Sequence, residues 1–386
     1  MNQITDMLKR NSLLLALIII IVLFETVIRM TGHGSLLSPQ NFTNIISQNS
    51  YVIILAVGML FCIVGCGNID LSVGSIVCLI GALAGVLMVN MEVNIYLSMA
   101  LCLLLGILIG AWHGFWIAYV RIPSFIVTLA GMMLFRGIAL LVLDGLTISP
   151  FDTEYLANFN SFIPKARASA FTLTMIVTLV LCAIFLLWGL YDRATKRRKG
   201  YELEPMASFA FRSVIVIGGL LFSGVLLGNH KGIPFILVIL AVVVLFYAFI
   251  ANKTVTGRRL YALGGNEKAA KLSGVNTNFI LFLAYVNMGF LSALAALVCV
   301  ARFNSAAPTA GTGYELDAIG SCFIGGASAY GGVGTIGGAV IGAVFMGVLN
   351  NGMSILGIDA NWQKTVKGMV LLIAVVIDVM SKKRAR

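Results

Sequence analysis

Long apolar runs with almost no charge constrain this chain more than any other feature of its sequence. Residues 12–30, 95–120, 171–191 and 278–301 each form such a run, and each reaches the roughly 18 apolar residues that mark a membrane-spanning helix. Lipid offers no hydrogen-bond partners, so runs of this length satisfy their backbone groups as helices. A transmembrane barrel would show short alternating segments instead. The runs therefore predict an all-α, polytopic integral membrane protein.

The charge distribution agrees with a membrane protein. Of the 386 residues, 60% are hydrophobic and 11% are charged, whereas soluble domains are about a quarter charged. The net charge is +11, but the basic residues gather in short segments between apolar runs, which is the positive-inside pattern and argues against nucleic-acid binding. We expect four clusters in the cytosol, and hence both termini: Lys9–Arg10, residues 193–199, the group Lys253, Arg258, Arg259, Lys268 and Lys271, and the C-terminal "KKRAR".

The apolar runs predict ten to twelve transmembrane helices in a single domain, residues 1–386. A basic cytosolic insert at 193–210 and a cytosolic loop at 252–277 interrupt them. The short, Gly-rich segment 315–329 could be a broken or re-entrant helix. The twelve expected spans are 12–30, 43–64, 72–89, 95–120, 123–145, 170–191, 211–229, 233–251, 278–301, 315–329, 334–351 and 364–380.

Two patterns bear on how these helices pack. The pairs Gly81–Gly85, Gly106–Gly110 and Gly338–Gly342 have a spacing that lets helix backbones approach closely, either within the chain or between two copies. The stretch "VGSI" at 73–76 returns as "VGTI" at 333–336. This echo predicts a duplication with a shift of 260 residues, although so short a match also arises by chance.

The sequence lacks the motifs of several enzyme and metal-protein classes. It contains no G-x-x-x-x-G-K-[ST], so no nucleotide-binding P-loop is expected. The histidines His33, His113 and His230 lie far apart and form no metal-ligand pattern. All seven cysteines fall in or beside apolar runs, where a thiol behaves as a small core residue. We predict no cofactor site in this chain.

Charged residues inside the predicted spans are few, and facing carboxylates of a proton relay are missing, which argues against ion-driven transport. Glu25 and Arg29 are four residues apart and should pair on one helix. Arg136 lies well inside its span; it either extends to the outer headgroups or serves as a structural tether or a polar group along a path. Asp70, in "GNIDLSVGS", is expected to cap a helix at a cytosolic turn.

The most informative loop is "TGRRLYALGGNEKAAKLSGVN", residues 256–276. Gly264–Gly265 interrupts the chain, Asn266 can cap a helix, Glu267 favours its first turn, and Gly274 can end it. These signals predict a short capped helix of about seven residues. It is either a basic surface segment on anionic headgroups or a docking helix for a partner protein.

Taken together, "GNIDLSVGSI", "RIPSFIVTLAGMMLFRGIAL", "GRRLYALGGNEKAAKLSGV", "GYELDAIGSCFIGGASAYGGVGTIGGAVIGA" and "LNNGMSILG" resemble the membrane permeases of bacterial sugar ABC importers. That family handles ribose, xylose, galactose and multiple sugars, and is related to the branched-chain amino-acid permeases. The likeness covers nearly the whole chain. The insert at 193–199 and the added spans near 171–251 resemble the xylose and multiple-sugar permeases most.

The resemblance implies a type II-like ABC importer permease fold in the bacterial inner membrane. It implies a cytosolic ABC ATPase that holds ATP-Mg, an extracytoplasmic sugar-binding protein and a second permease copy as partners, with alternating access as the mechanism. The sugar itself stays open. By the same resemblance the ATPase-coupling loop comprises Gly264, Gly265, Asn266, Glu267, Lys268, Ala269, Ala270, Lys271, Ser273 and Gly274.

Polar residues of the quoted segments are candidates for the translocation path or its gate. They are Asn68, Asp70, Ser72, Ser75, Arg136, Asn350 and Asn351. For each of them, a helix cap or an interhelical hydrogen bond is the simpler interpretation. Two other functions compete with the ATP-driven importer: an ion-coupled secondary transporter of a small polar solute, and a membrane-embedded assembly or channel subunit without a pump partner.

Overall fold

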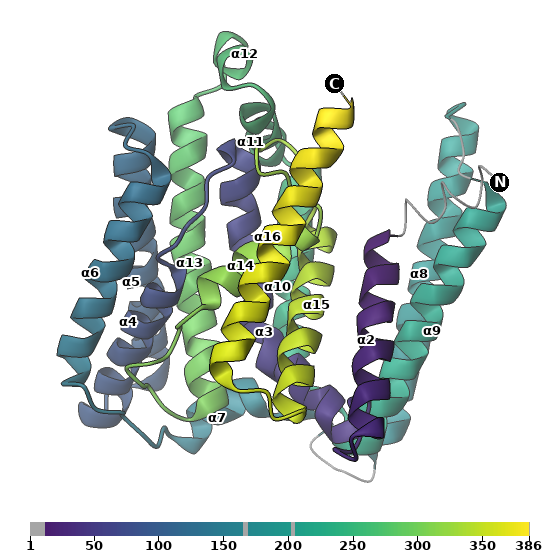
Figure 1. Cartoon of the computed structure of the whole chain (residues 1–386), viewed down its shortest axis with the longest axis horizontal. Helices are drawn as coiled ribbons and strands as arrows, with labels where there is room; N and C mark the ends of the chain where they lie inside the picture. Colours follow the sequence, from purple (N-terminus) through teal and green to yellow (C-terminus); the bar gives the residue numbers. More distant parts are fainter. Residues whose placement is uncertain (1–11, 165–168, 202–204, 386) are drawn as a thin grey trace.

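The computed structural model describes residues 12–164, 169–201 and 205–385, which form a bundle of helices (Figure 1). Ten of the described helical segments are long and apolar enough to cross a membrane, which confirms the predicted polytopic all-α fold. Nine of them correspond to α2 (Ser12–Met30), α3 (Pro39–Cys66), α5 (Ile95–Gly114), α6 (Ser124–Leu143), α8 (Ala170–Arg198), α9 (Met206–His230), α10 (Phe235–Lys253), α13 (Thr277–Phe303) and α15 (Ile336–Ile355).

The tenth span combines α4 (Val73–Gly85) with a π-helical turn, η1 (Val86–Asn90), and a second such turn, η2 (Phe115–Tyr119), extends α5. The last helix, α16 (Ala360–Ala385), has sufficient length but also carries Lys364, Lys367 and Asp378, and it is not among the ten. Shorter elements connect the long helices: α7 (Thr153–Asn160), β1 (Phe162–Ile163), β2 (Ile233–Pro234), α11 (Val255–Gly265) and α12 (Glu267–Leu272).

One expected span, 315–329, is wrong as a complete crossing. The chain forms only α14 (Tyr314–Ile324), 11 residues long, which rises about 16 Å where a bilayer core measures about 30 Å. Gly325 follows it directly, and residues 325–335 continue without a helix until α15 begins. The Gly-rich composition of this segment explains the early end, because glycine adopts irregular backbone conformations readily and is unfavourable in the interior of a helix.

Two non-helical segments enter the bundle from opposite ends. After α3, residues 67–72 run down into the bundle before α4 begins; after α13, residues 304–313 run up before α14 begins (Figure 1). Gly67 ends α3 with φ +69°, and its N–H donates to the Ile63 carbonyl at 2.7 Å. Glycine adopts a positive φ without steric cost, so the glycine at position 67 favours the end of α3 and the turn into the bundle at this point.

This arrangement relates two stretches of the chain as an inverted pair. In Figure 1, α3 rises, α4 descends and α5 rises, whereas α13 descends, α14 rises and α15 descends. Such inverted repeats with interrupted helices are common among transport proteins. The predicted 260-residue shift pairs α4 with the start of α15 and so joins different elements from those that the inverted arrangement relates.

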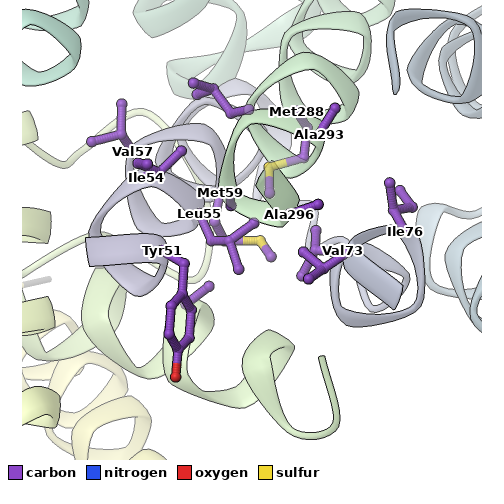
Figure 2. Close-up of a cluster of buried hydrophobic side chains, with 14 of the residues drawn as sticks. Tyr51, Ile54, Leu55, Val57, Met59, Val73, Ile76, Met288, Ala293 and Ala296 are labelled. Carbon is purple, nitrogen blue, oxygen red and sulfur yellow. The ribbon is translucent and has the colours of Figure 1, made fainter. Parts of the chain in front are cut away.

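The core lies where α3, α4 and α13 meet. Figure 2 shows Tyr51, Leu55 and Met59 of α3 beside Met288 of α13 and Val73 of α4, all of them buried. Close backbone contacts hold the second layer: Cβ atoms built on Gly106 of α5 and Gly289 of α13 would lie 2.6 Å and 2.1 Å from each other's carbonyl oxygens. The Gly106–Gly110 spacing therefore serves packing within the chain.

The bundle has two distinct ends. At one, called here the α12 end, lie α11, α12, the basic end of α8 and the C-terminal end of α16; at the other, the α7 end, lies α7 (Figure 1). The two short strands pair antiparallel, Phe162 with Pro234 and Ile163 with Ile233. The basic residues predicted for one side of the membrane at 193–198 and 253–271 thus share the α12 end.

Candidate functional site

The predicted capped helix is present at the α12 end. Asn266 is the N-cap of α12, and its side-chain oxygen accepts the Ala269 N–H at 3.0 Å. Glu267 occupies the first turn and Lys271 the last, as the favourable ends of the helix dipole require. Ser273 caps the helix, and Gly274 follows with φ +82°. Every local signal in the sequence agrees with the same short helix.

α12 presents most of its residues to solvent. Lys268, Ala269, Lys271 and Ser273 are exposed, and Leu272 is 90% exposed, while Ala270 is buried. Leu272 thus exposes an apolar side chain beside Lys268 and Lys271 at the tip of α12. The tip has the composition of a contact surface.

The other side of α12 is fixed to the bundle. Arg121, in the connection between α5 and α6, contacts the Glu267 carboxylate at 2.7 Å and also the Asn278 side chain of α13. Arg121 lies between α5 and α6, so its two contacts join α12 both to the α5–α6 connection and to α13.

α11 connects α12 to the interrupted helices. A Cβ built on Gly264 would lie 1.8 Å from the Val64 carbonyl oxygen, so only glycine allows α11 to rest on the last turn of α3. The Tyr261 hydroxyl donates to the Gly334 carbonyl at 2.8 Å, just before α15. Displacement of α12 would thus reach the segments that follow α3 and precede α15.

Inside the bundle, the starts of α4 and α14 meet. A Cβ on Gly74 would lie 2.1 Å from the Gly311 carbonyl oxygen, and one on Gly311 would lie 1.9 Å from the Gly74 carbonyl oxygen. The Glu315 carboxylate also lies against Gly74. Two helix N-termini, with their partial positive charges, therefore approach each other with a carboxylate between them.

Asp70 is buried, 1% exposed, in the segment that leads to this junction. The expectation of a cytosolic turn was wrong in position, because residues 67–72 enter the bundle instead of crossing its surface. Asp70 does not cap an N–H of α4 itself: one of its carboxylate oxygens accepts the N–H at 2.9 Å and the hydroxyl at 2.5 Å of Ser72, the residue just before the helix. Ser72 and Ser75 are buried beside it, and Asn68 is half-buried.

Arg136 is a tether. Its guanidinium donates to the carbonyl oxygens of Pro308 at 3.1 Å and Ala310 at 2.6 Å, joining α6 to residues 304–313. Those carbonyls have no helix to satisfy them, since the segment is irregular. Of the two interpretations of this arginine, the contacts favour the structural one over extension to the headgroups.

The two asparagines of α15 face different partners. Asn351 exchanges hydrogen bonds with Asn41 of α3 at 2.8 Å and 3.1 Å, which is an interhelical pair. Asn350 approaches the Asp317 carboxylate of α14 at 3.5 Å. The Lys367 ammonium of α16 lies 3.0 Å from the same carboxylate, and its side chain is 18% exposed against 4% for Asp317. A largely buried ion pair therefore joins α14 to α16.

Sequence reasoning missed part of this arrangement. Lys367, Asp317 and the Gly74–Gly311 contact were not among the candidates. A lysine inside an expected span is itself a signal, because intramembrane charges are costly and pair with one another. The Gly311 contact has no comparable signal, since it depends on two segments 237 residues apart meeting end to end.

The described residues hold no cluster of three or more His, Cys, Asp or Glu side chains placed to bind a metal ion. The seven cysteines are free thiols, six of them buried. None of the seven path candidates lines either of two hollows that lie at α8 and α9. Their partners differ: Arg136 contacts Pro308 and Ala310, Asn351 contacts Asn41, and Asn350 approaches Asp317.

Known proteins resemble this chain over nearly its full length. The xylose transport system permease protein XylH of Haemophilus influenzae is 38% identical over 376 residues, 96% of each chain, and XylH of Escherichia coli is 40% identical over 96% of this chain and 92% of its own. The ribose import permease protein RbsC of Escherichia coli is 35% identical, over 96% of this chain and 94% of its own. No solved structure matches.

A family model described as "Branched-chain amino acid transport system / permease component" matches residues 41–375. That range includes both interrupted helices, the α11–α12 loop and the Asp317–Lys367 pair. It omits only the first helix and the two ends of the chain. The chain therefore belongs to this family of permease components and is a transmembrane permease subunit rather than an enzyme.

Proposed function

We propose that this chain forms the membrane path of an ATP-driven sugar importer in the bacterial inner membrane. The relatives that cover nearly all of it are named as xylose transport and ribose import permeases, and this observation carries the proposal. The pentose class is common to both names. In this proposal a cytosolic ABC ATPase, an extracytoplasmic sugar-binding protein and a second copy of the chain complete the transporter.

The orientation follows from charge. The basic residues of α8, α11 and α12 gather at the α12 end, so this end faces the cytosol by the positive-inside pattern, and the α7 end meets the binding protein. The C-terminal end of α16 and the start of α2 lie at the α12 end (Figure 1), which supports the proposal that both termini are cytosolic.

The mechanism is alternating access, with α12 as the helix that docks in the ATPase. Leu272 and the lysines beside it enter a groove of the partner, and Arg121 holds the opposite side of the helix. When ATP binding moves the partner, α12 carries α11 with it. The Gly264 contact with the end of α3 and the Tyr261 hydrogen bond to Gly334 pass that motion to the segments around the interrupted helices.

The test reconstitutes the chain with its candidate ATPase and binding protein and measures sugar-stimulated ATP hydrolysis. We expect Leu272→Asp to abolish stimulation while the purified permease keeps its thermal stability, because Leu272 makes no contribution to the core. Val255→Asp adds the same charge to an exposed residue of the same loop and should retain stimulation.

The charge exchange Glu267→Arg with Lys271→Glu is a second test. The new arginine at position 267 would repel Arg121. The exchange also puts a cation at the N-terminus of α12 and an anion at its C-terminus, where each is unfavourable for the helix dipole. If this variant and Leu272→Asp both leave complex assembly and coupling intact, α12 is not the docking helix.

An ion-coupled secondary transporter is the alternative, and the buried Asp317–Lys367 pair is the observation that favours it, because such pairs occur in proton pathways. Sugar uptake that survives ATP depletion and collapses with an ionophore would establish that alternative. Uptake that follows ATP and requires the binding protein would exclude it.

A further inference from the structure

A groove runs between α8 and α9 near the α12 end, away from the interrupted helices. Its volume is about 630 Å³. The two helices pack mainly on each other and form a hairpin at the edge of the bundle (Figure 1). Within its lining, a Cβ built on Gly189 would lie 2.9 Å from the Phe209 ring, so glycine at this position allows the Phe209 side chain of α9 to approach α8 closely. The groove is thus a built feature of the hairpin.

The lining changes character along α8. Leu181 and Ile184 are apolar, Trp188 follows, and Lys196 lies at the end, 15 residues after Leu181. At the helical rise this is about 22 Å. Tryptophan is enriched where hydrocarbon meets the headgroup layer, and lysine lies beyond it. The groove therefore runs from acyl-chain depth to headgroup depth.

Cations from both helices converge at its charged end. The Arg193 guanidinium lies 5.0 Å from the centre of the Phe209 ring, and Arg212 enters from α9. Lys196 pairs with Asp192 at 2.7 Å, the one carboxylate among the described lining residues. A second hollow of about 490 Å³ shares Arg193 and adds Arg197 and Arg198. Among the described lining residues of both hollows, basic side chains therefore outnumber acidic ones, which suits a phosphate group.

The outer faces of the hairpin are open to the bilayer. Trp188 is 73% exposed, Tyr191 72% and Leu187 67%. A phospholipid can enter the groove sideways, with its chains already in hydrocarbon, so no apolar ligand has to cross water. Basic pockets between transmembrane helices on the cytosolic side are recognised by anionic lipid headgroups.

We propose that this groove binds one anionic phospholipid of the cytosolic leaflet. Its phosphate lies between Lys196 and Arg212, the glycerol level lies against Trp188, and an acyl chain covers Leu181 and Ile184. The site is separate from the proposed transport path. The proposal depends on the proposed function only through the orientation, in which the α12 end faces the cytosol.

Trp188 reports on this site directly. In a chain with Trp112, Trp116 and Trp362 replaced by Phe, Trp188 is the one remaining tryptophan of the four. The protein is placed in nanodiscs of phosphatidylethanolamine that contain a small fraction of brominated lipid. We expect brominated phosphatidylglycerol or cardiolipin to quench Trp188 more strongly than brominated phosphatidylethanolamine at the same mole fraction. Comparison of the two anionic lipids shows whether the site prefers a lipid with one phosphate or a lipid with two.

Charge variants define the site. Lys196→Gln with Arg212→Gln should weaken the apparent affinity for the anionic lipid by roughly tenfold or more, since each basic group near an anionic headgroup contributes about one kcal/mol. Lys196→Arg with Arg212→Lys keeps the charge and should retain binding. Lys199→Gln with Arg258→Gln removes the same charge from residues outside the groove and serves as the matched control.

Two results would overturn the proposal: equal quenching by anionic and zwitterionic lipid, or equal loss in the groove variant and the control, which would mean ordinary lipid around a basic surface. Because the measurement needs neither the ATPase nor sugar, its failure is distinct from a failure of the proposed transport function.

Discussion

α3 and α8 are two long apolar helices of one chain with opposite surroundings. The most apolar stretch of α8 has a higher mean hydropathy than that of α3, yet only 22% of it is buried inside the protein, against 94% for the stretch of α3. In a membrane, lipid replaces the core as the apolar environment, so greater hydropathy does not imply deeper burial. The difference shows that hydropathy alone does not identify the helices that form the interior of this bundle.

The same contrast holds for glycine and for charge. Gly74 and Gly311 lie where no Cβ fits, whereas a Cβ on Gly218 or Gly219 of α9 meets nothing within 4 Å. The Asp317–Lys367 pair is largely buried, whereas Asp192 and Lys196 of α8 are about half exposed. The interior and the hairpin thus offer matched positions at which each type of contact can be removed.

The largest effect is expected at the junction of α4 and α14. Gly311→Ala requires a side chain at φ +74° and 1.9 Å from a carbonyl oxygen, so it should destabilise the fold by more than about 3 kcal/mol. Gly218→Ala, which meets open space in a helix, should be neutral or slightly stabilising. Thermal unfolding of the purified protein, followed by size exclusion, measures both. Similar melting temperatures for the two variants would mean that α4 and α14 do not meet this closely.

Removing one member of the buried ion pair should come next. Lys367→Met leaves Asp317 with only Asn350 nearby, at a cost of about 3–5 kcal/mol, while the double variant with Asp317→Asn should be more stable than Lys367→Met alone. The corresponding cycle at Asp192 and Lys196 should give a coupling of about 0–1 kcal/mol. Additive effects in the first cycle would contradict a direct Asp317–Lys367 contact.

The helices and their caps could be predicted from residues that are close to one another in the sequence. Each of the twelve expected spans contains a helix, and the cap at Asn266 and the pair of Glu25 with Arg29 are present. These features depend on residues within a few positions of one another, through apolar period, capping or helical spacing. α14 is the one expected span that ends too early to cross.

Long-range contacts could not be predicted in this way. Asp70 was expected at a surface turn because it lies between two apolar runs, and nothing nearby indicates that residues 67–72 enter the bundle. The partners of Arg136 are carbonyl oxygens about 170 residues later, which have no side-chain signature. The site candidates were therefore identified as polar residues in the right segments, while their partners required the tertiary structure.

Substitution of Arg136 tests whether its contacts with residues 304–313 stabilise the protein. Arg136→Met leaves the Pro308 and Ala310 carbonyls without this donor, and charged hydrogen bonds of this kind contribute about 1.5–3 kcal/mol. We expect a loss of that order in thermal stability, with partial recovery in Arg136→Lys. Arg29→Met, at a 68% exposed side chain, is the control and should change little. An Arg136→Met protein with unchanged stability and transport would restore the headgroup interpretation.

Substitutions of Asp70 should have the smallest effect on stability. They distinguish a role of its hydrogen bond from a role of its negative charge. Asp70→Asn keeps an oxygen that can accept the Ser72 N–H, so its cost should stay within about 1 kcal/mol, whereas Asp70→Leu leaves that buried N–H unpaired at about 1–3 kcal/mol. Melting temperature and sugar uptake are measured for both. If the two substitutions are equally harmful, the negative charge itself is required near the start of α4, and Asp70 acts through the helix dipole more than through its hydrogen bond.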